Sequence, residues 1–81
     1  MSISVKRFFD VFCKIYDDLY NYPAYIDGYD DAVDAFDSFL ADHGDFVGKF
    51  AAFRGDFVSS DREAAAFMFA LYELSGGAAH A

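Results

Sequence analysis

Several aspartates between Asp27 and Asp45 are spaced closely enough to raise the question of cation binding. An EF-hand loop needs alternating oxygen ligands, a glycine at its sixth position and a glutamate at its twelfth. The segment Asp27-Gly28-Tyr29-Asp30-Asp31 does not follow that pattern. We therefore expect no dedicated calcium site and no other metal.

Two further residues have side chains that could take part in catalysis. His43 lies between Asp42 and Asp45, but a lone histidine at a helix C-terminus is more often stabilised by the helix dipole than catalytic. Cys13 lies at the edge of an apolar stretch, which is typical of a small buried side chain rather than a nucleophile. No glycine-rich phosphate loop or basic stripe accompanies them. The sequence predicts no enzyme activity and no cofactor.

A short segment resembles a carrier-protein motif. Asp37-Ser38-Phe39-Leu40, in an acidic chain of 81 residues, is similar to the Asp-Ser-Leu segment of acyl carrier proteins, whose serine carries phosphopantetheine. In that family the serine begins a helix after a glycine-containing loop, whereas Ser38 lies deep in a helical pattern. A motif of two or three residues has a high rate of false matches, so we do not expect Ser38 to carry a prosthetic group.

The composition is that of one packed domain. Hydrophobic residues make up 56% and aromatic residues 21% of the chain, well above the composition of disordered proteins. We assign residues 1–75 to a single helical domain and residues 76–81, Gly-Gly-Ala-Ala-His-Ala, to a flexible C-terminal tail.

The single cysteine excludes an intramolecular disulfide and favours a reducing compartment. Asp10 lies where a signal peptide would have its apolar stretch. The longest apolar run, 64–72, is shorter than the roughly 20 residues of a membrane-spanning helix. We therefore expect a cytoplasmic protein that does not enter a membrane.

The spacing of apolar residues predicts four helices. One begins at Val5, capped by Ser2 or Ser4, and ends before Pro23; the others span 29–42, 45–54 and about 60–74. Asp27-Gly28 is expected to form a turn, Gly44 to close the second helix in the left-handed conformation, and Asp45 to cap the third.

The fourth predicted helix is the most apolar. Ser60 and Glu63 form a capping box ahead of it, in which each side chain satisfies a backbone donor. The run 64–72 is apolar nearly all round, as in a helix covered on every side. We therefore predict an all-α fold, a compact bundle of about four short helices around an apolar C-terminal helix. The third predicted helix is supported by the 4-3-4 spacing of four phenylalanines: Phe46, Phe50, Phe53 and Phe57.

Negative charge is concentrated in one part of the chain, whose net charge is −8. Residues 1–14 have a balance of +2 and residues 49–81 a balance of −1. Residues 15–48 contain no lysine or arginine and nine aspartates: Asp17, Asp18, Asp27, Asp30, Asp31, Asp34, Asp37, Asp42 and Asp45. Such a surface repels nucleic acid and anionic membranes, so we expect neither as a direct partner.

Twelve of the fourteen acidic residues are aspartate, the poorer helix former of the two acids. Folding alone does not require that choice, whereas a short side chain holds its carboxylate in a better-defined position. On a helix, Asp30, Asp34 and Asp37 would share a face, about 6 Å and then about 4.5 Å apart along the axis. Phosphates on one strand of a duplex advance about 3.4 Å each, so this row is on the length scale of alternate phosphates.

Tyrosines accompany the acidic segment. Tyr22, Tyr25 and Tyr29 surround the predicted turn and are candidates for an interface, because tyrosine combines apolar area with a polar tip. Tyr16 and Tyr20 lie on the apolar face of the first predicted helix and are assigned to the core.

In size, acidity, aspartate and tyrosine content and lack of catalytic residues, the chain resembles the small phage and plasmid proteins that inhibit bacterial defence by DNA mimicry, of the anti-CRISPR and antirestriction type. Antirestriction proteins have a helix–glycine–helix arrangement that is also similar to the stretch Phe39-Leu40-Ala41-Asp42-His43-Gly44-Asp45-Phe46. The resemblance implies binding to a CRISPR surveillance complex or restriction enzyme where DNA would enter. The predicted partner-binding residues are Asp27, Asp30, Asp31, Asp34, Asp37, Asp42, Asp45, Tyr22, Tyr25 and Tyr29.

Two alternatives remain. The chain could be a small helical adaptor or regulatory subunit that binds a basic protein surface unrelated to nucleic acid. The acidity could instead be a general adaptation to salt, although its confinement to residues 15–48 counts against that reading. We expect a monomer or a weak dimer.

Overall fold

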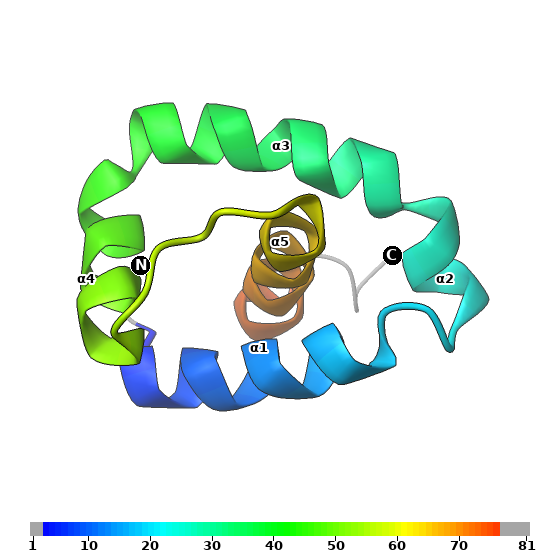
Figure 1. Ribbon diagram of the computed structural model, residues 1–81, viewed down its shortest axis with the longest axis horizontal. Helices are drawn as coiled ribbons and strands as arrows, with labels where there is room; N and C mark the ends of the chain where they lie inside the picture. The colour runs from blue at the N-terminus through cyan, green and yellow to red at the C-terminus, as the bar shows by residue number, and fades with distance from the viewer. Residues whose placement is uncertain (1–2, 77–81) are drawn as a thin grey trace.

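The computed structural model describes residues 3–76, which form five helices and no strand. The helices are α1 (Val5–Asp18), α2 (Pro23–Asp27), α3 (Tyr29–Asp42), α4 (Gly44–Arg54) and α5 (Asp61–Ser75). In Figure 1, α5 runs through the middle, α1 and α3 lie on opposite sides of it, and α4 and α2 close the two ends. This confirms the all-α prediction and the central C-terminal helix. Residues 77–81 of the predicted tail lie outside the described residues.

The core is built on Phe67, whose side chain is fully buried. Its ring lies 4.7–6.0 Å, between centroids, from five other phenylalanine rings. These rings come from α1, α3 and α4: Phe8, Phe36, Phe39, Phe46 and Phe50. Ala65, Ala66 and Ala70 are also fully buried. The small side chains of α5 allow the surrounding helices to approach closely, so aromatic rings fill the remaining space.

The α1–α3 connection contains a helix that the sequence analysis missed. Pro23 begins α2, where its fixed φ suits a first helical position and its missing N–H costs no hydrogen bond. Gly28 caps the end of α2 and precedes α3 directly. Pro23 was interpreted only as a helix terminator, and a helix of five residues is too short to show a periodic pattern.

The α3–α4 junction also differs from the expectation. His43 caps both helices: its N–H donates to the Phe39 carbonyl at 2.7 Å and its carbonyl accepts from the Phe46 N–H at 3.1 Å. Gly44 is the first residue of α4 and does not take the left-handed conformation, and Asp45 lies in the first turn instead of capping it. One non-helical residue, His43 with φ −134° and ψ 42°, suffices to change the helix direction, so no left-handed residue is needed.

The caps at the other helix ends agree more closely with the sequence prediction. Ser4 caps α1, and Gly55 ends α4 with φ +84°. The Ser60 hydroxyl accepts from the Glu63 N–H at 3.1 Å. The capping box is only half formed, however, because the Glu63 carboxylate accepts from the Ser59 N–H at 3.2 Å and pairs with Arg54 of α4 instead of returning to the Ser60 N–H.

None of the helices within residues 3–76 has the length and apolar character needed to cross a membrane.

Candidate acidic interface

The predicted row of carboxylates lies on the outer side of α3. Ala32, Phe36 and Phe39 bury the inner side of this helix against α5. The aspartates lie on its other sides, and the four that precede its last turn are exposed: Asp30, Asp31, Asp34 and Asp37. We call these four, together with the exposed Asp27, Asp42 and Asp45, the acidic face.

No lysine or arginine within residues 3–76 forms an ion pair with the acidic face. The ion pairs of this part of the chain join Lys6 to Asp10 at 3.2 Å and Arg54 to Asp56 and Glu63. The exposed basic residues of the N-terminal segment, Lys6, Arg7 and Lys14, lie on α1, across α5 from α3 (Figure 1). The molecule is therefore electrostatically polar, with one strongly negative side.

Only two of these aspartates lie where a negative charge would stabilise α3. Asp30 and Asp31 lie in its first turn, where the helix dipole favours carboxylates. Asp34 and Asp37 gain nothing from the dipole, and Asp42 lies in the last turn, where the dipole disfavours a negative charge and no basic residue offsets it. A helix selected for stability alone would carry lysine or arginine there.

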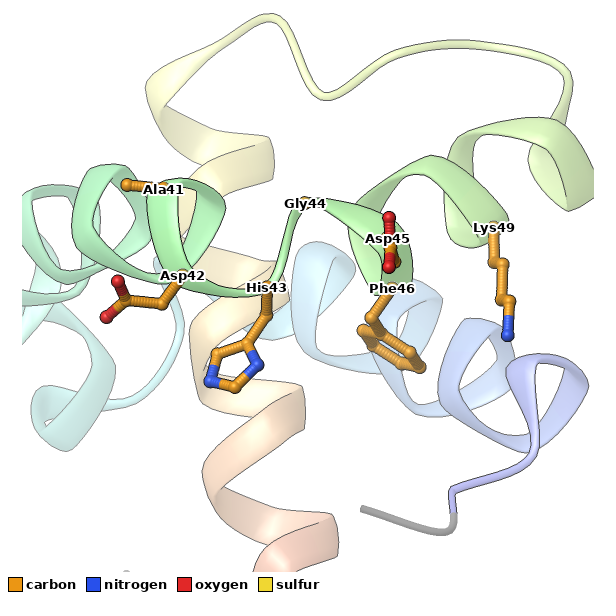
Figure 2. A pocket seen from close by; sticks show the side chains of 7 residues that line it. All are labelled: Ala41, Asp42, His43, Gly44, Asp45, Phe46 and Lys49. Carbon is orange, nitrogen blue, oxygen red and sulfur yellow. The ribbon is translucent and has the colours of Figure 1, made fainter.

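A hollow of about 550 Å³ lies at the α3–α4 corner, where the acidic face ends. Figure 2 shows Asp42 on one side of it, Asp45 and Lys49 on the other, and the rings of His43 and Phe46 pointing the same way between them. The His43 ring packs on Phe39 with the centroids 4.8 Å apart. The corner can accept a lysine or arginine side chain of a partner between the carboxylates of Asp42 and Asp45. Within residues 3–76, no group of acidic, histidine or cysteine side chains is arranged to hold a metal ion.

The three candidate tyrosines are not equally exposed. Tyr22 is 52% exposed, whereas Tyr25 and Tyr29 are half-buried. Tyr25 packs against Phe69 of α5, with ring centroids 4.9 Å apart, and Tyr29 stacks on Tyr20 at 6.0 Å. Only Tyr22 of the three therefore offers most of its ring to a partner.

The environments of Tyr25 and Tyr29 keep their phenols neutral. Burial, followed by the charge of Glu73, raises the pKa of Tyr25. Burial and a side-chain hydrogen bond with Tyr20 raise the pKa of Tyr29 to about 12. Both phenols therefore stay protonated to a higher pH than an unperturbed tyrosine does.

Tyr20 corrects the assignment made from the sequence. It was placed in the core as part of the first helix, but α1 ends at Asp18 and Tyr20 is 55% exposed. Arg62 of α5 lies over the rings of both Tyr16 and Tyr20, at 4.1 and 4.9 Å from their centroids. The exposed Tyr20, Tyr22 and Ile26 thus form an apolar patch beside Asp27 that sequence reasoning only partly identified.

Two of the four phenylalanines whose spacing predicted the third helix are exposed. Phe53 lies within α4 and packs on Phe9 of α1, yet is 52% exposed, whereas Phe57 lies beyond the Gly55 cap, outside the helix, and is 75% exposed. The inward position is taken instead by Arg54, which packs over Phe12 and Phe50 and pairs with Glu63. The Cys13 thiol is half-buried, and burial together with Asp17 and Asp10 raises its pKa, which disfavours the thiolate.

No known protein family, curated protein or solved structure matches this chain. The functional argument therefore depends on the geometry and charge described above.

Proposed function

We propose that this chain is an inhibitor that lays its acidic face on the nucleic-acid-binding surface of a bacterial defence complex, of the CRISPR or restriction type. The carboxylates occupy the lysines and arginines that would otherwise contact phosphates, so the inhibitor and the DNA compete. The long-range field of the acidic face accelerates the encounter with a basic groove. The protein acts in the cytoplasm of the bacterial host and contacts neither nucleic acid nor membrane directly.

One observation carries the proposal: a row of short, exposed carboxylates on α3 without a compensating cation in residues 3–76. The row is held rigid by the buried side of the same helix, through Phe36 and Phe39. A rigid row can be presented in register with a row of cations at little entropic cost on binding. The charge at Asp42 opposes the stability of α3, which supports a role in binding instead of folding.

A cell-based assay tests the proposal. The chain is expressed in bacteria that carry an active CRISPR or restriction system, and the plating efficiency of a targeted phage is measured. We expect wild-type protein to restore infection and the triple variant Asp30→Asn, Asp34→Asn, Asp37→Asn to lose most of that effect.

The matched control is a triple variant that removes three carboxylate charges outside the acidic face: Asp10→Asn, Asp17→Asn and Glu73→Gln. These three residues are exposed and lie on α1 and α5, so the acidic face stays intact. This variant should retain protection of the phage. Equal loss in both triple variants would mean that net charge, and not the α3 row, is responsible.

A second candidate function, an adaptor that binds a basic protein surface unrelated to nucleic acid, is favoured by a different observation. The patch of Tyr20, Tyr22 and Ile26 offers apolar area next to Asp27, as in mixed protein–protein interfaces. The two functions differ in their response to DNA. An adaptor's partner keeps binding the chain in the presence of excess duplex, whereas the target of a DNA mimic releases it.

A further inference from the structure

The outer side of α4 and the segment that follows it carry an apolar surface that residues 3–76 leave uncovered. Phe57 is 75% exposed, more than the other large hydrophobic side chains exposed in this part of the chain, and Phe53 is 52% exposed. Complete burial of a phenylalanine side chain is strongly favourable in water. We call Gly48, Ala52, Phe53, Gly55 and Phe57 the α4 patch.

The α4 patch contains a hollow beside its exposed ring. The hollow has a volume of about 420 Å³ and is lined by Gly48, Ala51, Ala52 and Gly55, together with the side chains of Asp56 and Phe57. The first four residues carry no side chain larger than a methyl group. A hollow of this size can take an aromatic ring, provided that the ring comes from another molecule.

Gly48 has no evident purpose within the chain itself. It lies in the middle of α4, where glycine costs up to about 1 kcal/mol relative to alanine. A Cβ placed on Gly48 would meet nothing within 4 Å, so no neighbour forces the absence of a side chain. Close approach by a second molecule is a physical reason for a glycine at such a position.

The charges around the α4 patch select a second copy of this chain as the occupant. Residues 44–60 contain two acidic and two basic residues, but Arg54 is largely buried and pairs with Glu63, so the exposed charges here are those of Asp45, Asp56 and Lys49. Two acidic molecules repel one another less through a surface that carries a cation than through the acidic face, which carries none on α3. Lys49 is exposed and forms no ion pair within residues 3–76, which leaves its ammonium available to Asp45 or Asp56 of a second copy.

The α4 patch is also self-complementary, since it presents an exposed ring and a hollow side by side. A two-fold dimer requires the same surface on both subunits, with a projection of each placed in a recess of the other. In an antiparallel pair of α4 helices centred near residue 50, Gly48 of one copy faces Ala52 of the other. Small residues at both positions allow the two backbones to approach closely.

We propose that two copies of this chain associate through the α4 patch with two-fold symmetry, with Phe57 of each copy seated in the hollow over Gly48 and Ala52 of the other. The patch is small compared with the interfaces of permanent dimers, so the association is weak and concentration-dependent. Because α4 closes one end of the bundle (Figure 1), the outer side of α3 stays uncovered in this arrangement. The inference does not rest on the proposed function.

Sedimentation equilibrium of the full chain, at protein concentrations up to about 1 mM and at low and high salt, tests the dimer. We expect a monomer–dimer equilibrium that becomes tighter in high salt, because screening reduces the repulsion between two acidic chains. Salt should have the opposite effect on binding to the acidic face. The failure of one proposal is therefore distinguishable from the failure of the other.

Two variants and a control locate the contact. Phe57→Ser removes the projection and should weaken association at least about tenfold. Gly48→Leu fills the hollow and should weaken association similarly while raising the melting temperature of the monomer, because leucine is the better helix former and its Cβ has open space. Tyr22→Ser, at the α2 end of the molecule, should leave association unchanged.

Three results would overturn the dimer. The wild-type chain could remain monomeric over the whole concentration range. Phe57→Ser and Gly48→Leu could associate as the wild type does. Association could be weakened by salt and lost in Asp34→Lys, which would assign the contact to an attraction between the acidic face and basic residues of another copy.

Discussion

Phe67 is the residue on which the packing of four helices converges, since its ring contacts phenylalanines from α1, α3 and α4. We expect Phe67→Ala to lower the free energy of unfolding by about 3 kcal/mol or more, because the cavity cannot collapse while five rings surround it. Chemical denaturation at dilute concentration measures this. Phe57→Ala, at an exposed position, should cost less than about 0.5 kcal/mol under the same conditions; equal losses would contradict the central position of α5.

Tyr29 gives the fold a dependence on alkaline pH. Its pKa in the folded chain is about 12, above the usual value of 10.0. The unfolded chain therefore releases the phenol proton first, so the contribution of Tyr29 to stability is complete below pH 10 and is lost as the pH rises towards 12. Burial raises the pKa of Tyr25 and Cys13 as well, and both act in the same direction.

The matching variant is Tyr29→Phe. We expect its free energy of unfolding to fall less steeply between pH 10 and 12 than that of the wild type, as measured by urea denaturation at a series of pH values. Identical slopes would show that the phenol of Tyr29 is equally acidic in the folded and unfolded chains.

At the scale of elements, Arg62 joins α5 to the end of α1. Its Nε and Nη2 donate to the Tyr16 carbonyl at 3.2 and 2.7 Å, and its guanidinium covers the Tyr16 and Tyr20 rings. We expect Arg62→Lys to lower the free energy of unfolding by about 1–2 kcal/mol, since an ammonium cannot make both hydrogen bonds while stacking on the rings. Thermal unfolding measures the loss, and Arg7→Lys, at an exposed position of α1, is the control.

The helices that the sequence predicted are those with long, regular patterns. α3 and α5 have clear apolar periods or caps, and both were placed within a residue or two of their bounds. α2 was missed because five residues contain no period. The phenylalanine spacing of the third predicted helix continues to Phe57, whereas α4 ends at Arg54 and is capped by Gly55, so Phe57 lies outside the helix.

The candidate site was predictable in part for a related reason. The aspartates of α3 follow from the helical wheel, because the opposite side of that helix is apolar and must face the core. The tyrosines depend on tertiary packing: Tyr25 is covered by Phe69, and Tyr20 loses its cover where α1 ends. The α4 patch could not be anticipated, since its exposure depends on where α5 lies.

The whole molecule separates its surface into distinct regions. The acidic face lies along α3, the exposed tyrosine and isoleucine patch lies at α2, and the α4 patch lies at the opposite end (Figure 1). A general adaptation to salt would spread carboxylates over the surface, whereas here one side of the bundle carries a continuous row. This distribution supports recognition of a partner that is basic on one surface.

The most direct test of the proposed function is an equilibrium competition. Labelled protein is titrated with a panel of purified CRISPR surveillance complexes and restriction enzymes, each measured alone and after saturation with duplex DNA, at low and high salt. The account predicts that at least one of them binds the protein, and that this binding is lost to duplex DNA, weakened by salt and abolished in the Asp30, Asp34 and Asp37 to asparagine variant. Binding that persists on the DNA-loaded complex, or binding by none of the panel, would contradict it.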